Sequence, residues 1–157
     1  MNIYDHVQKT MIHEIHKYRP KLTVTAQNVV AKQPPFPYVS FLIYNDEAMV
    51  GGSNNLDWFF MQIQMKAVSD KENEAKALGY WLRHFEYLQQ PLLDLKDQGI
   101  VPLKNVSMVP NVNRFIQNSF QFESGADLKI GVYKPVIDTT QPGRINKINS
   151  HFHRKGD

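Results

Sequence analysis

The residues best suited to chemistry are the six histidines of the chain, and they are divided among three regions. His13-Glu14-Ile15-His16 is similar to the paired histidines of a helical zinc site. That site needs a spacing of four residues, because only then do both imidazoles meet one metal ion. Here the spacing is three, and no third ligand is evident. His151 and His153 lie in a polar terminal stretch, so we predict no metal site in either place.

Other catalytic motifs are also missing from the sequence. The chain has no cysteine, which excludes a thiol nucleophile, a zinc–thiolate site and a disulfide framework. Gly51-Gly52 is not followed by the Lys-Ser or Lys-Thr of a phosphate-binding loop, and a strand pattern follows it where a helix is required. We therefore predict no catalytic residue, no cofactor and no enzyme. A hydrolase whose site is assembled from distant residues is the rival hypothesis.

The positive charge of the protein is concentrated at its C-terminal end. The 157 residues carry a formal charge of +3, and Arg144, Lys147, Arg154 and Lys155 against Asp157 account for all of it. The neutral remainder argues against a broad phosphate-binding face. The alternative function is therefore a nucleic-acid-binding module that acts through this basic tail. No apolar run approaches the ~18 to 20 residues of a membrane span, so we predict no membrane partner.

Hydrophobic periodicity gives the elements that must position any site. The strongest signal is a strand from Trp58 that leads into a helix at Ser69-Asp70-Lys71-Glu72, where Ser69 and Glu72 form a predicted capping box. The helix is expected to run to Leu88 and to resume after Pro91. The remaining predicted elements are a helix over 2–18 and strands over 22–30, 38–44, 100–110 and 115–133.

These elements predict an α+β fold, with an antiparallel or mixed sheet of about four to five strands and two main helices packed on it. Pro102 and Pro110 place their strand at an edge of the sheet. Gly125-Ala126-Asp127 permits either one bent strand or a hairpin. We expect one domain over residues 1–138 and an extended or disordered basic tail over residues 139–157.

This pattern resembles the tail terminator proteins of long-tailed bacteriophages, also called neck terminator proteins. The likeness covers roughly residues 2–137, and three features carry it: Pro35-Phe36-Pro37-Tyr38-Val39-Ser40-Phe41 opening a strand, the helix from Glu72 to Leu88, and the aromatic run from Arg114-Phe115 to Tyr133.

The resemblance implies an α+β subunit that forms a hexameric ring on the end of the tail tube. It implies four partners: other copies of the chain, the major tail tube protein, a head-completion or connector protein, and DNA only as it passes through the ring. The expected location is the virion tail or neck, after assembly in the host cytoplasm. Another head–tail connector or completion protein is the alternative within this class.

We expect subunit contacts to come from a long loop, Asn45 to Leu56, and from the tail, because loops on rigid sheets are common contact surfaces. Lys129 and Lys134 are candidates for a lumen-facing or DNA-facing charge. The predicted subunit or partner contacts are Asp46, Glu47, Met49, Val50, Asn54, Asn55, Arg144 and Lys147.

Overall fold

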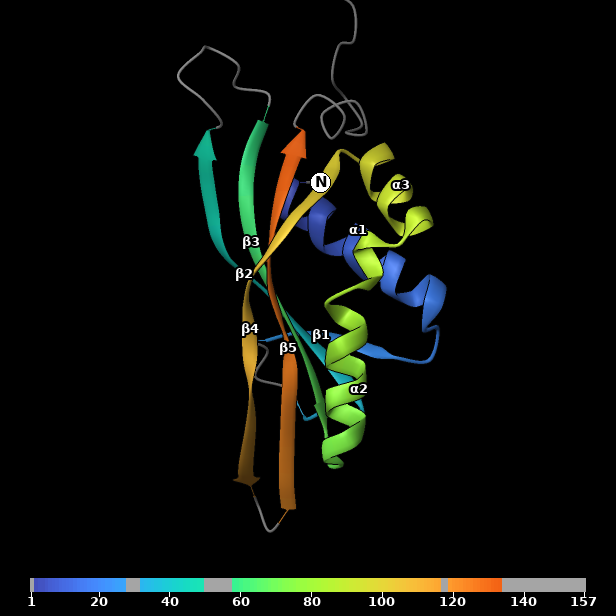
Figure 1. The fold of residues 1–157 in the computed structure, drawn as a ribbon, viewed down its shortest axis with the longest axis vertical. Helices are drawn as coiled ribbons and strands as arrows, with labels where there is room; N and C mark the ends of the chain where they lie inside the picture. The colour runs from blue at the N-terminus through green and yellow to red at the C-terminus, as the bar shows by residue number, and fades with distance from the viewer. Residues whose placement is uncertain (1, 28–31, 50–57, 117–118, 134–157) are drawn as a thin grey trace, which may run out of the picture.

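The computed structural model describes residues 2–27, 32–49, 58–116 and 119–133 (Figure 1). Its elements in chain order are α1 (Ile3–Tyr18), β1 (Thr23–Ala26), β2 (Tyr38–Met49), β3 (Trp58–Ser69), α2 (Glu72–Leu82), the 3-10 helix η1 (Phe85–Tyr87), α3 (Gln89–Asp97), β4 (Ile100–Ile116) and β5 (Ser119–Tyr133). The predicted tail, residues 139–157, lies outside the described residues.

The strands form one mixed sheet in the order β1-β2-β3-β5-β4. β1 runs parallel to β2, and all other neighbours are antiparallel. The helices lie on one face of this sheet (Figure 1). The predicted α+β class is confirmed: the sheet has five strands, α1 and α2 are the main helices, and α3 is a third. Within the described part of the chain, no helix has both the length and the apolar character that a membrane span requires.

The core lies between β3 and the helices. Met61, Ile63, Met65 and Ala67 alternate along β3, and all four are fully buried. They pack in one cluster with residues of both neighbouring strands and of all three α-helices, such as Met11 of α1. Alternation places one face of a strand in the core, which is why the period-two pattern at β3 was a reliable signal.

β2 is longer than the sequence pattern predicted. We expected a loop from Asn45 to Leu56, but the strand continues to Met49, and residues 50–57 lie outside the described residues. The strand persists because β3 extends far enough to pair with it, through two register shifts. The polar side chain of Asn45 is accommodated by a hydrogen bond of 3.0 Å to Gln62 on β3.

The hairpin of β4 and β5 corrects the predicted strand boundaries. β4 continues past Pro110 to Ile116, and β5 begins at Ser119 and pairs with it antiparallel. Gly125 therefore lies inside one continuous strand. β4 is an edge strand, as its prolines predicted, and register shifts next to Pro102 and Pro110 accommodate them.

The predicted capping box is wrong, although the strand-to-helix transition is where the pattern placed it. Lys71 is the N-cap of α2, and it makes no side-chain capping bond. The Ser69 hydroxyl accepts a hydrogen bond from the Lys71 backbone N–H (3.1 Å) and donates to the Glu74 carboxylate (2.5 Å). Ser69 remains the last residue of β3, because its backbone pairs with Phe122.

The helical run after β3 is divided earlier than predicted. α2 ends at Leu82, six residues before the predicted Leu88. The one-turn helix η1 follows, and α3 begins at Gln89 with Pro91 in its first turn, as the sequence indicated. The two predicted helical pieces are therefore confirmed, but the break precedes Pro91.

α2 crosses β5 closely at Gly79, which gives a testable prediction. A Cβ at Gly79 would overlap the Ser124 hydroxyl oxygen and lie 2.6 Å from the Ser124 Cβ. Alanine is the better helix former by about 1 kcal/mol, so any loss of stability reports packing. We expect Gly79→Ala to lower the free energy of unfolding by about 1 to 3 kcal/mol in urea denaturation. Adding Ser124→Gly should recover part of this loss; equal stability of Gly79→Ala and wild type would contradict the close crossing.

Candidate assembly interface

Three phenylalanines cluster at the end of the β4–β5 hairpin, and we call Phe115, Phe120 and Phe122 the Phe tip. Phe115 and Phe120 face each other across the two strands, with ring centroids 5.2 Å apart in an edge-on arrangement. The Phe122 ring stacks 6.2 Å from that of Phe120. Phe115 is 64% exposed and Phe120 is 56% exposed, so the hairpin presents two large apolar side chains to solvent.

The Phe tip is exposed because the helical layer ends before the hairpin does. Phe122 pairs with Ser69, the last residue of β3, and by alternation it faces the same side of the sheet as buried Ser124 and Ala126. α2 begins at Glu72, and the hairpin extends past its first turn (Figure 1). The helix-facing side of β5 therefore continues into a stretch that none of the described helices covers. Contiguous exposed apolar side chains of this kind mark contact surfaces.

Charged groups on the opposite face hold the base of the hairpin to β3. The Glu123 carboxylate is buried, and its oxygens lie 3.7 Å from the Lys66 ammonium and 3.4 Å from the Arg114 guanidinium. Gln121 donates a hydrogen bond of 3.3 Å to the same carboxylate. Arg114 remains more than half exposed, and by strand alternation it lies on the face of the sheet opposite Phe115 and Phe120.

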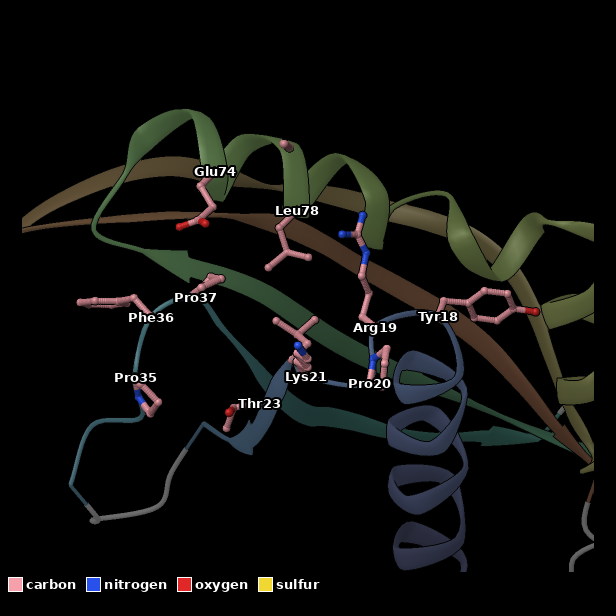
Figure 2. Close-up of a pocket in the computed structure, with 12 residues that line it drawn as sticks. Tyr18, Arg19, Pro20, Lys21, Thr23, Pro35, Phe36, Pro37, Glu74 and Leu78 are labelled. Atoms are coloured by element: carbon pink, nitrogen blue, oxygen red, sulfur yellow. The ribbon is translucent and has the colours of Figure 1, made fainter.

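A pocket of about 530 Å³ lies where α1 leads into β1, and we call it the Pro pocket (Figure 2). Its walls come from the α1–β1 connection, from the segment before β2, and from α2. In Figure 2, Leu78 of α2 points toward Pro37, and the Glu74 side chain extends from the same helix. The apolar and aromatic residues of the wall are Tyr18, Pro20, Leu22, Pro35, Phe36, Pro37, Ala77 and Leu78.

Three charged side chains line the Pro pocket: Arg19, Lys21 and Glu74. Arg19 points toward α2 in Figure 2, and its guanidinium carbon lies 5.2 Å from the centre of the Trp81 ring, within cation–π range. Lys21 is exposed and also lines the pocket, and Glu74 is the single acidic residue among those that line it. The pocket is therefore a mainly apolar hollow whose lining carries two cations and one carboxylate.

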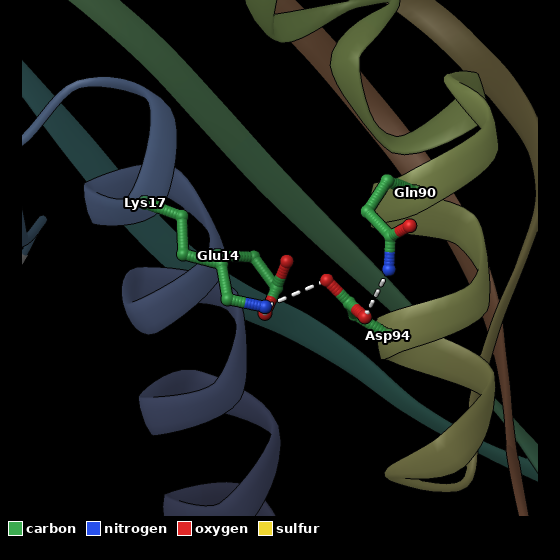
Figure 3. Close-up of polar contacts among 4 residues, drawn as sticks. All are labelled: Glu14, Lys17, Gln90 and Asp94. Atoms are coloured by element: carbon green, nitrogen blue, oxygen red, sulfur yellow. Dashed lines mark hydrogen bonds and ion pairs between the residues drawn. The ribbon is translucent and has the colours of Figure 1, made fainter.

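A second groove, of about 440 Å³, lies between α1 and α3 and is polar. Lys17 reaches across it to Asp94 (2.6 Å) and also contacts Glu14 (3.0 Å), while Gln90 donates to Asp94 (Figure 3). The hydrogen bonds to Asp94 and Glu14 raise the pKa of Lys17 above its usual value, and the bond from Lys17 lowers the pKa of Asp94. This network ties α1 to α3.

The ammonium group of Lys17 compensates the charge of the buried Glu14 carboxylate, which gives a second testable prediction. Glu14 is 3% exposed, and one of its carboxylate oxygens has no hydrogen-bond partner among the described residues. We expect Lys17→Met to lower the urea midpoint, because it leaves a buried carboxylate without a cation. Adding Glu14→Leu should restore the midpoint, whereas Lys9→Met in the same groove should not change it. An unchanged midpoint in Lys17→Met would refute this role.

Two histidines of α1, His6 and His16, contact backbone carbonyl groups. His16 Nε2 lies 2.9 Å from the Leu22 carbonyl oxygen, and His6 Nε2 lies 3.0 Å from that of Gln98. No group of three or more potential metal-ligating side chains occurs within the described residues. The histidine pair at His13 and His16 therefore has no third ligand there.

The predicted contact residues are only partly described. Asp46, Glu47 and Met49 belong to the end of β2, so they are strand residues and not loop residues as predicted. Lys129 lies on β5 with its ammonium 4.0 Å from the centre of the Phe60 ring; its lumen-facing or DNA-facing role stays a prediction. The other predicted positions, Val50, Asn54, Asn55, Lys134, Arg144 and Lys147, lie outside the described residues.

Sequence reasoning missed both the Phe tip and the Pro pocket. The signal for the Phe tip was present, since Phe115, Phe120 and Phe122 flank Gln117-Asn118. It was not recognised because the turn was sought at Gly125. The Pro pocket had no local signal, because its three walls come from segments far apart in the chain.

No protein-family model matches this chain, and no curated protein is significantly similar to it.

Proposed function

We propose that this protein is a structural subunit of a phage virion, similar to tail terminators, that forms a ring which ends tail-tube polymerisation and joins the tail to the head or neck. The observation that carries the proposal is the exposed Phe tip on a projecting hairpin. Two exposed phenylalanine rings are unfavourable in an isolated subunit, and an adjoining subunit would remove them from water.

The phage context comes from the resemblance of the element order and of the Pro-Phe-Pro-Tyr strand start. The mixed sheet with helices on one face agrees with the α+β fold that the resemblance implies. The proposal gives the protein no catalytic step and no cofactor. Its partners are other copies of itself, the tail tube protein and a head-completion or connector protein.

Light scattering of the purified full-length chain, with and without the purified tail tube protein, tests this proposal. We expect ring-sized oligomers, either alone or on the tube, and electron micrographs should show shorter tubes when the protein is added. A chain that stays monomeric at 18.2 kDa in both conditions, and that leaves tube growth unchanged, would overturn the proposal.

The basic tail supports the second candidate, a nucleic-acid-binding module. Arg144, Lys147, Arg154 and Lys155 could neutralise four phosphates, and the logarithm of the DNA affinity would then fall with a slope of about −4 against the logarithm of the salt concentration. Fluorescence anisotropy with duplex DNA between about 50 and 200 mM salt measures this slope. A salt-independent or undetectable interaction would reject this candidate.

A further inference from the structure

We propose that the Pro pocket is a binding site for a small organic carboxylate, a molecule with an apolar body and a single carboxylate group. Two features of the pocket carry this proposal: its mainly apolar wall, and two cations in its lining that have no anionic partner among the described residues. The site lies within one copy of the chain, so it goes beyond the proposed assembly and does not depend on it.

The Pro pocket has the size and the lining of a small-molecule site. Its volume of about 530 Å³ is within the usual range for sites that enclose a ligand. The α1–β1 connection, the segment before β2 and α2 form its walls, and Leu78 of α2 points toward Pro37 across the hollow (Figure 2). Polar groups of a sugar or a nucleotide would find few partners on such a wall. A hydrocarbon ring or chain is therefore the better fit for most of the volume.

The Arg19 guanidinium is positioned to bind a carboxylate. Its carbon lies 5.2 Å from the centre of the Trp81 ring, and this cation–π contact holds the side chain against α2. The contact uses none of the five N–H donors of the guanidinium. Within the described part of the chain, those donors form no hydrogen bond or ion pair. A guanidinium with unused donors matches the two oxygens of a carboxylate.

Lys21 adds a second cation to the same lining. It lies two positions after Arg19 on the α1–β1 connection, and its side chain is exposed. The Lys21 ammonium likewise forms no ion pair with any described residue. One carboxylate at this end of the pocket can therefore attract both cations.

Glu74 does not neutralise these two cations. It is the single acidic residue of the lining, but it forms no ion pair with Arg19 or Lys21, and its carboxylate accepts a hydrogen bond from Ser69. Seven residues separate it from Trp81 on α2, which is about 10 Å along the helix axis. In Figure 2, Glu74 and Arg19 lie at opposite ends of the pocket. The ligand carboxylate is therefore expected at the Arg19 end, away from Glu74.

The charge of the lining favours a ligand with one negative charge. Two cations against one carboxylate leave the lining with a net charge of +1. A polyphosphate or a nucleic acid carries several negative charges, and proteins bind these with more cations than the pocket offers. A cationic ligand would meet two like charges. An apolar monocarboxylate satisfies both the wall and the charge.

Isothermal titration calorimetry of the full-length chain with three probes of one carbon skeleton tests the proposal. The probes are phenylbutyrate, phenylbutanol and phenylbutylamine. Phenylbutyrate should bind with a stoichiometry of one, about four- to twentyfold more tightly than phenylbutanol, because it adds two exposed ion pairs. Phenylbutylamine should bind most weakly, and raising the salt from about 50 to 500 mM should reduce the advantage of the acid. Equal affinities of acid and alcohol, or no binding of the acid at millimolar concentration, would overturn the proposal.

Single substitutions test each cation separately. Arg19→Met and Lys21→Met remove the charge and keep an apolar stem, so each should weaken phenylbutyrate about two- to fivefold and leave phenylbutanol unchanged. Lys9→Met, which removes a cation from the polar groove between α1 and α3, is the matched control and should bind as wild type does. Equal weakening in Lys9→Met and Lys21→Met would show a general charge effect and reject the site.

Filling the pocket tests its apolar part. Ala77 lines the pocket and is exposed on α2, so Ala77→Trp should fold, as circular dichroism can verify. This variant should weaken the acid and the alcohol together. Amide chemical shifts give a second measurement on the wild-type chain: phenylbutyrate should shift the signals of Arg19, Lys21 and Ala77. Shifts confined to other residues, or an Ala77→Trp variant that binds as wild type does, would overturn the proposal.

The outcomes separate this site from the proposed function. A chain that binds phenylbutyrate in the Pro pocket but never assembles with itself or with tube protein keeps the carboxylate site and loses the proposed function. A chain that forms rings but shows no preference for the acid keeps the proposed function alone.

Discussion

Replacing Gly125 with alanine is expected to destabilise the protein by about 3 kcal/mol or more. Gly125 pairs with Lys66 within the β3–β5 ladder, and a Cβ there would overlap the carbonyl oxygen of Met65. The overlap is with backbone, so no side chain can rotate to relieve it, and the two central strands must separate. The shift in midpoint in urea denaturation, followed by circular dichroism, measures the loss.

Gly131 is the matched control because it is also a glycine of β5 paired with β3. A Cβ at Gly131 would meet the Trp58 ring at 3.4 Å, which is an ordinary van der Waals contact. Gly131→Ala should therefore change the free energy of unfolding by less than about 1 kcal/mol. Similar effects of the two substitutions would show that the close approach at Gly125 is not what requires glycine.

The stability of the protein is expected to fall as the pH rises from about 4.5 to about 8, because of Glu86. This residue of η1 is 1% exposed, and neither carboxylate oxygen has a hydrogen-bond partner among the described residues. Burial raises the pKa of Glu86 from 4.5 to about 8. In this window the folded protein keeps a proton that the unfolded chain releases, so the contribution is fully present below pH 4.5 and is lost as the pH approaches 8.

Each unit of pKa difference corresponds to 1.36 kcal/mol, so the change across the window is about 3 to 5 kcal/mol. Urea denaturation at intervals from pH 4.5 to pH 8.5 measures it. Glu86→Gln has no titrating proton and should remove this component of the slope, with its largest gain over wild type near pH 8. Glu72→Gln, at an exposed position on α2, should keep the wild-type slope. A Glu86→Gln variant with an unchanged slope would show that Glu86 is charged when buried.

The sequence alone determined the elements whose signal is local. The alternation at Met61, Ile63, Met65 and Ala67 gave β3 its buried face, and the helical repeat gave α1 to within one residue. Pro102 and Pro110 indicated the edge strand, because proline lacks the N–H that a central strand must donate. These signals hold because a single strand or helix shows its period regardless of what it packs against.

The boundaries were decided by the tertiary structure. β2 extends to Met49 and β4 to Ile116 because each has a partner strand with which to form hydrogen bonds. The length of the partner strand cannot be read from the residues of β2 or β4 themselves. The Ser69–Glu72 capping box failed for the same reason, since pairing with Phe122 keeps Ser69 in β3. Gly125 was interpreted as a possible turn, whereas its absent side chain makes room for the Met65 carbonyl.

The candidate interface also depends on the tertiary structure. The sequence supplied Phe115, Phe120 and Phe122, but only the hairpin register brings their rings together, and only the start of α2 at Glu72 leaves them uncovered. The Pro pocket needs three segments that meet only after the sheet and helices have packed. Local periodicity therefore fixed which residues face the core, while exposure of the Phe tip and formation of the Pro pocket depended on how far each element extends over its neighbours.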